Sequence, residues 1–138
     1  MLVVDTSAVL HALVARPADP DLVTRLTEDD DWHAPHAIDV EILHALRGLV
    51  LGSKIGAGRA GEALTDFADL RIRRYPHAPL VERAWELRSN LTAYDAVFMA
   101  LSEMLDAPLV TCDSAMGKAK TQAVVEVYGT GRARRRGR

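Results

Sequence analysis

Four acidic residues from distant parts of the 138-residue sequence are the strongest candidates for chemistry. Asp5 and Asp113 each come at the end of a short apolar run that is typical of a buried strand. Asp95 lies in the first turn of an expected helix that begins after Thr92, and Glu41 lies early in another expected helix. The sequence places no obvious basic partner beside any of the four. Carboxylates that converge without such partners raise one another's pKa or bind a cation.

A divalent cation is the partner that these side chains favour. Oxygen ligands with no cysteine or histidine in register favour Mg²⁺ or Mn²⁺ over zinc. An ion held by carboxylates, with coordination positions left open, suits phosphodiester hydrolysis because it lowers the pKa of a bound water and polarises the phosphoryl oxygen. It would also offset the repulsion between an acidic pocket and a polyanionic substrate. The residues therefore indicate a metal-dependent hydrolase.

Each acid also has an ordinary structural explanation. Asp5 could cap the helix that follows it, and Asp95 could form a capping box with Thr92. Glu41 could stabilise its helix dipole, and Asp113 could open a turn. These explanations are the better ones for any single acid. The convergence of all four at one place favours a functional site.

The elements expected along the chain explain that convergence. Short strands alternate with helices, which indicates parallel βαβ units and an α/β fold, a three-layer α/β/α sandwich with a mostly parallel central sheet. The carboxyl ends of such strands form one edge of the sheet, where ligands bind. The expected strands cover residues 2–4, 32–35, 71–75, 108–111 and 123–128. The expected helices cover residues 6–13, 21–28, 38–52, 62–70, 80–88 and 93–105, with a glycine-rich loop at 53–61.

Composition places the chain among globular proteins. Hydrophobic residues make up 49% and charged residues 26% of the sequence, which fits one domain with a real core. No apolar run approaches the roughly 18 residues of a membrane span, so no membrane association is expected. The single cysteine, Cys112, suits a reducing compartment, and a cytoplasmic location is expected.

The charge of the chain is unevenly divided. The last nine residues carry five arginines and no acid, so residues 1–129 have a formal net charge of -7, against -2 for the whole chain. We expect a single domain over residues 1–129, followed by a basic, flexible tail over residues 130–138. The alternative is that the tail holds nucleic acid through phosphate contacts.

Four segments of the sequence, in order and with matching spacing, resemble the PIN-domain family. They are Val3–Ala8, Val40–Arg47, Leu91–Ala96 and Leu109–Asp113. Within that family the chain is most similar to the small VapC-type toxins of toxin–antitoxin pairs, over about residues 1–128. The resemblance implies a PIN-like fold and a Mg²⁺- or Mn²⁺-dependent endoribonuclease. It also implies a homodimer and a cognate antitoxin that covers the active site.

The resemblance also implies roles for individual residues. Asp5, Glu41, Asp95 and Asp113 would form the catalytic metal site. Ser7 or Thr6 would supply the hydroxyl that the family has close to its first aspartate, and Thr111 matches a hydroxyl position before the last acid. The position of Lys118, soon after Asp113, suits contact with a phosphate of the RNA. A water activated by the metal would then attack the phosphorus and leave a 5′-phosphate.

Three other functions fit the sequence less well. A phosphatase with an aspartyl nucleophile would need an acid two residues after Asp5, where Ser7 stands. A receiver domain would need paired acids at the end of the first strand, where Val4 precedes Asp5. The remaining alternative is a non-catalytic RNA- or antitoxin-binding module with a vestigial acidic metal site. The presence of all four acids counts against that module without demonstrating turnover.

Overall fold

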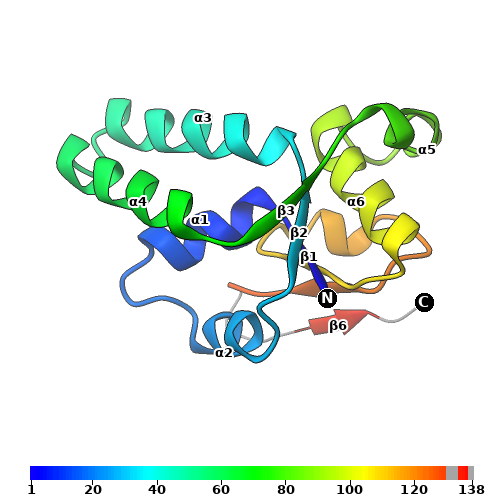
Figure 1. The fold of residues 1–138 in the computed structure, drawn as a ribbon, viewed down its shortest axis with the longest axis horizontal. Coiled ribbons are helices and arrows are strands. Elements are labelled where there is room, and N and C mark those ends of the chain that lie inside the picture. Colours follow the sequence, from blue (N-terminus) through cyan, green and yellow to red (C-terminus); the bar gives the residue numbers. More distant parts are fainter. Residues whose placement is uncertain (130–133, 137–138) are drawn as a thin grey trace.

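The computed structural model describes residues 1–129, together with the backbone of residues 134–136. The other residues of the expected tail, 130–133 and 137–138, lie outside the described residues. One sheet runs through the molecule in the order β3-β2-β1-β4-β5-β6, and its first five strands are parallel (Figure 1). The strands are β1 (Leu2–Val4), β2 (Trp32–Pro35), β3 (Ile72–Tyr75), β4 (Leu109–Thr111), β5 (Val125–Val127) and β6 (Arg134–Arg136).

Helices cover both faces of this sheet. The crossovers from β1 to β2 and from β2 to β3 run in one direction, and the crossover from β3 to β4 runs in the other. Because such crossovers are right-handed, the two groups of helices lie on opposite faces. Figure 1 shows α1, α3 and α4 on one side and α5 and α6 on the other, which confirms the three-layer α/β prediction. The helices are α1 (Thr6–Val14), α2 (Pro20–Glu28), α3 (Ala37–Leu51), α4 (Ala57–Asp69), α5 (Val81–Glu86) and α6 (Ala93–Leu105).

The hydrophobic core lies against both faces of the central strands. All three residues of β1 and all three of β4 are buried, because helices cover these strands on both sides. Phe98 and Met99 of α6 fill one face, while Val9 of α1 and Ile42 of α3 lie in the core of the other layer. No helix of the described residues is long and apolar enough to cross a membrane.

The expected loop at residues 53–61 is wrong in its second half, because α4 already begins at Ala57. Its glycines predicted a loop. However, a Cβ built at Gly58 or Gly61 would meet nothing within 4 Å, so both positions are open. Ala60, Ala63 and Phe67 lie on the other side of the helix and are buried at helical spacing. Burial of that apolar side outweighs the low helix propensity of glycine.

The remaining differences concern short elements. The expected helix at 80–88 is a 3₁₀ turn, η1 (Ala78–Leu80), followed by the six-residue α5. The last expected strand is shortened to Val125–Val127. Three residues of the expected tail, Arg134–Arg136, pair antiparallel with β5 as the edge strand β6.

Candidate active site

The structure brings the four candidate acids to one cavity at the carboxyl edge of the sheet. Asp5, Glu41, Asp95 and Asp113 all line this cavity of about 220 Å³. Asp5 follows β1, Asp113 follows β4, and the other two lie near the N-termini of α3 and α6. The rest of the lining consists of Thr6, Ser7, Leu10, Ala45 and Phe98.

Asp5 is the most buried of the four acids, with only 5% of its surface exposed. It caps α1 by accepting a hydrogen bond from the backbone N–H of Ala8 at 3.0 Å. Ser7 Oγ also donates to its Oδ1 at 2.8 Å, and Thr111 Oγ1 donates to its Oδ2 at 2.6 Å. Burial raises the pKa of Asp5 to about 6, although these hydrogen bonds lower it. The capping role and a role in the site therefore coexist in one side chain.

The hydroxyl of Thr111 joins two of the acids. It is fully buried, donates to Asp5, and accepts the backbone N–H of Asp113 at 2.9 Å. Ser7 Oγ makes a parallel link, because it donates to Asp5 and accepts the N–H of Cys112 at 2.9 Å. Ser7, one of the two hydroxyls indicated near the first aspartate, and Thr111, the one indicated before the last acid, thus hold the start of the loop after β4 against the end of β1.

Glu41 and Asp95 lie half-buried across the cavity. Thr6 Oγ1 donates to Glu41 Oε2 at 2.8 Å, so this third hydroxyl orients an acid of a different helix. Burial, and then the charge of Asp95, raises the pKa of Glu41. Burial, and then the charge of Asp113, raises the pKa of Asp95. Three of the four acids therefore hold a proton more readily than an isolated carboxyl does.

Asp95 owes its position to the start of α6. Thr92 caps this helix, and its Oγ1 accepts the N–H of Asp95 at 3.2 Å. The capping interaction that the sequence offered as an alternative explanation is present. This cap uses the backbone N–H of Asp95, so the Asp95 carboxylate still lines the cavity and is available for a role there.

The donor set fits a divalent ion that keeps part of its water shell. Within residues 1–129, none of the four acids forms an ion pair with a basic side chain. In the same residues, no three acidic, histidine or cysteine side chains lie close enough to hold a metal ion by themselves. Mg²⁺ typically binds through one or two carboxylates and retains several waters. Carboxylates that share a cavity without closing a cage fit that mode of binding.

Sequence reasoning missed three apolar residues of the cavity. Leu10, Ala45 and Phe98 line the cavity three or four residues after Ser7, Glu41 and Asp95, respectively. This helical spacing was a usable signal. Lys118 is exposed at the end of η2 (Met116–Lys118) and does not line the cavity.

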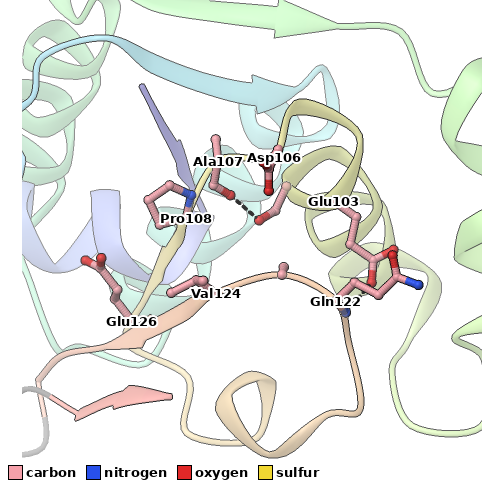
Figure 2. A pocket seen from close by; sticks show the side chains of 9 residues that line it. Glu103, Asp106, Ala107, Pro108, Gln122, Val124 and Glu126 are labelled. Carbon is pink, nitrogen blue, oxygen red and sulfur yellow. Dashed lines mark hydrogen bonds between the residues drawn. The ribbon is translucent and has the colours of Figure 1, made fainter. Parts of the chain in front are cut away.

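A second acidic cavity, of about 280 Å³, lies at the amino ends of β4 and β5, opposite the carboxyl ends that carry the first cavity (Figure 2). Two of its carboxylates, Glu103 and Glu126, form ion pairs with arginines, unlike the acids of the first cavity. Glu126 accepts from Arg25 Nε at 2.7 Å and from the hydroxyl of Tyr128. Burial raises the pKa of Glu103, but hydrogen bonds from Arg83, Thr121 and the backbone N–H of residue 122 lower it to about 2. These acids are committed to structural pairs.

Comparison with known proteins agrees with the fold and with the sequence resemblance. The family model of the PIN domain matches residues 2–121. Ribonuclease VapC1 of Mycobacterium tuberculosis is 42% identical over 118 residues, which cover 85% of this chain and 89% of that protein. Ribonuclease VapC12 of the same organism is 34% identical over 119 residues, which cover 86% of this chain and 92% of that protein.

Two solved structures share the architecture at low sequence identity. One is VapBC2 of Rickettsia felis, bound to a DNA fragment from its promoter. It aligns with a TM-score of 0.68 at 16% identity, over 92% of this chain and 98% of that chain. PAE2754 of Pyrobaculum aerophilum aligns with a TM-score of 0.65 at 23% identity over 90% and 82% of the two chains. The chain belongs to the PIN-domain family, and its similarity is to the VapC ribonucleases within it.

Proposed function

We propose that this protein is a Mg²⁺- or Mn²⁺-dependent endoribonuclease that acts as the toxin of a toxin–antitoxin pair. The observation that carries the proposal is the cavity lined by Asp5, Glu41, Asp95 and Asp113, in which no described basic side chain neutralises the acids. The relatives at 34–42% identity are named ribonucleases, which supports RNA as the substrate.

The four acids of the cavity would have two roles in hydrolysis, binding the metal ion and orienting the attacking water. Asp5 and Asp95 would hold the ion, with Glu41 and Asp113 acting directly or by orienting a water. When bound, the ion would supply a more acidic water and a positive charge facing the RNA phosphate. A water would attack the phosphorus in line and leave a 5′-phosphate.

The hydroxyls that bind the acids contribute by restricting their movement. Thr111 and Ser7 fix both oxygens of Asp5, and Thr6 fixes one oxygen of Glu41. Carboxylates held in this way need little rearrangement when an ion and a phosphate arrive. Phe98, Leu10 and Ala45 exclude water from one side of the cavity, which strengthens the electrostatic interactions there.

The proposed partners are a cognate antitoxin and a second copy of this chain. Solved structures with the same fold include a toxin–antitoxin complex from Klebsiella pneumoniae, which supports the antitoxin. Large apolar side chains are more than half exposed on three helices, which supports a homodimer that would cover them. These side chains are Val40, Leu43 and Leu51 on α3, Val81 and Trp85 on α5, and Tyr94 and Met104 on α6. The proposed setting is the cytoplasm, where RNA and an antitoxin would meet the protein.

Cleavage of a mixed RNA pool tests the activity. We expect purified protein to cut with Mg²⁺ or Mn²⁺ and to be inactive with a chelator. Asp5→Asn should abolish cutting without unfolding the chain, whereas Asp66→Asn, on the exposed side of α4, should cut like the wild type. Cutting that persists in Asp5→Asn would refute the site. A folded wild type that binds RNA or an antitoxin but never cuts would instead identify a non-catalytic module with a vestigial metal site.

A further inference from the structure

Basic residues gather beside the acidic cavity, around the carboxyl end of β5. Thr111 at the end of β4 is the register partner of Val127, and Val127 is the register partner of Arg134 in β6. Neighbouring strands lie about 4.8 Å apart, so the backbone of Arg134 lies about 10 Å from that of Thr111. Since Thr111 binds both Asp5 and the backbone of Asp113, β6 begins level with the cavity and two strands away from it.

One lysine reaches the same place from the loop after Asp113. Gly117 of η2 lies so close to β5 that a Cβ built on it would be 2.6 Å from Val127 Cγ2. Lys118 follows directly and is exposed. Val127 therefore has the turn that carries Lys118 against its side chain and the arginine strand beside its backbone. We call Lys118 and Arg134–Arg136 the basic edge.

The negative charge of the rest of the molecule makes the cations of the basic edge important for binding a polyanion. Residues 1–129 carry a formal net charge of -7, and the cavity adds local negative potential from four carboxylates. A polyanion that approaches such a surface is repelled unless cations lie nearby. Phosphate contacts from lysine and arginine supply most of the affinity of non-specific nucleic-acid binding.

We propose that the basic edge binds the phosphate backbone of the RNA on the β5 side of the cavity. The inference rests on the proposed function, because it takes the substrate to be RNA. It assigns a role to Lys118 and to Arg134–Arg136, and the arginines lie beyond the matched family region, which ends at residue 121. Charged edge strands also prevent edge-to-edge association, and that role is the competing outcome of the test below.

The test measures binding without cleavage. All variants carry Asp5→Asn in the full chain, and the probe is a fluorescein-labelled single-stranded RNA of mixed sequence in Mg²⁺ buffer. The test variant is Arg134→Gln with Arg136→Gln. The control is Arg71→Gln with Arg73→Gln, an exposed pair with the same spacing at β3, the opposite edge of the sheet. Arg71 and Arg73 lie four and two positions before the carboxyl end of β3. Arg134 and Arg136 pair with Val127 at the carboxyl end of β5 and with Val125 two positions before it, so the control pair lies further from the cavity edge.

We expect the β6 variant to bind the RNA about tenfold more weakly, because two phosphate contacts are lost. The slope of the logarithm of affinity against the logarithm of salt concentration should become shallower by about 1.4 for this variant. Each phosphate contact on a single strand contributes about 0.7 to that slope. The control should bind as tightly as its parent. Lys118→Gln should also weaken binding, by the loss of one phosphate contact.

Three results would overturn the inference. They are equal losses in the β6 variant and the control, unchanged affinity in the β6 variant, and self-association of the β6 variant with unchanged RNA affinity. The last result would leave edge protection as the role of the arginines. Cleavage by proteins with native Asp5 is recorded in parallel, so that cutting without any effect of the basic edge refutes this inference alone. An effect on binding without cutting refutes the nuclease alone.

Discussion

At the scale of single residues, Asp5 shows how one carboxylate serves both the fold and the site. It accepts hydrogen bonds from Ala8, Ser7 and Thr111, and burial still raises its pKa to about 6. The Asp5 carboxylate at the cavity therefore carries a desolvated negative charge whenever the pH is above that value. Such a charge is a cost to the free protein and an advantage when a cation binds.

Asp5→Asn should stabilise the metal-free protein in a pH-dependent manner. Asp5 has a pKa of 3.8 in the unfolded chain and about 6 in the folded one. Well below pH 3.8 it is protonated in both states, so the wild type carries no penalty there. Above pH 6 the folded state holds the buried charge, at a cost of about 3 kcal/mol. Urea unfolding in chelator should show the advantage of the variant growing between these pH values. A difference that does not change with pH would contradict the assignment.

Thr111→Val should impair both stability and cleavage. The valine would leave Asp5 Oδ2 without its donor and the N–H of Asp113 without its acceptor. Loss of partners by buried polar groups costs about 1–3 kcal/mol, measured by urea unfolding. Thr111→Ser keeps the hydroxyl and should retain most of the cleavage of the RNA pool. If valine and serine variants cleave equally, the hydroxyl does not position these acids.

At the scale of elements, the pattern of the sequence predicted the long, capped segments well. Thr92 and the apolar residues after it predicted α6 with its observed bounds, because a local cap and a buried side agree there. The run Leu2–Val4 predicted β1, and the parallel topology that follows brings Asp5, Glu41, Asp95 and Asp113 to one edge.

What the sequence did not predict depends on contacts between distant residues. The start of α4 follows from burial of Ala60 and Phe67 and not from its own glycines. The link between Thr6 and Glu41 joins residues 35 positions apart, so no local pattern reports it. The pairing of Arg134–Arg136 with β5 likewise requires the edge of a completed sheet.

Gly117→Ala tests how tightly η2 packs on β5. The new Cβ would meet Val127 Cγ2 at 2.6 Å, and such overpacking typically costs about 1–3 kcal/mol. Val127→Ala removes that methyl group, so the double variant should lose less stability than the two single variants together. Gly61→Ala is the control, because its Cβ meets nothing and should stabilise α4 by about 1 kcal/mol. Additive losses in urea unfolding would show that the new Cβ does not press on Val127.

At the scale of the whole molecule, the uncompensated cavity predicts stabilisation by metal. Mg²⁺ or Mn²⁺ binds the folded state and should raise the melting temperature in a concentration-dependent manner. Asp5→Asn should remove most of this response, and Asp66→Asn should keep it. Differential scanning fluorimetry across a metal titration measures the effect. Equal responses in all three proteins would place the bound ion elsewhere.

The proposed homodimer is testable through its exposed apolar side chains. Trp85 is 67% exposed, so Trp85→Glu should leave the fold intact while placing a charge in an interface. We expect light scattering to show a dimer of the wild type and a monomer of the variant. The control is Val23→Glu on α2, a 43% exposed side chain outside this set that should tolerate the charge. A dimer that survives Trp85→Glu would place the interface on another surface.

Because β1 lies at the centre of the sheet, the sheet cannot be completed until later strands have been synthesised. β1 is synthesised before the other five strands of the sheet, yet it pairs with β2 on one side and with β4 on the other. The ends of β1 and β4, joined by Thr111, carry acids separated by more than a hundred residues. A nascent chain that has not yet produced β4 lacks both that hydroxyl and Asp113. The cavity is therefore completed only after β4 and Asp113 have been synthesised, so a shorter nascent chain lacks the full set of acids while it is still attached to the ribosome and its messenger RNA.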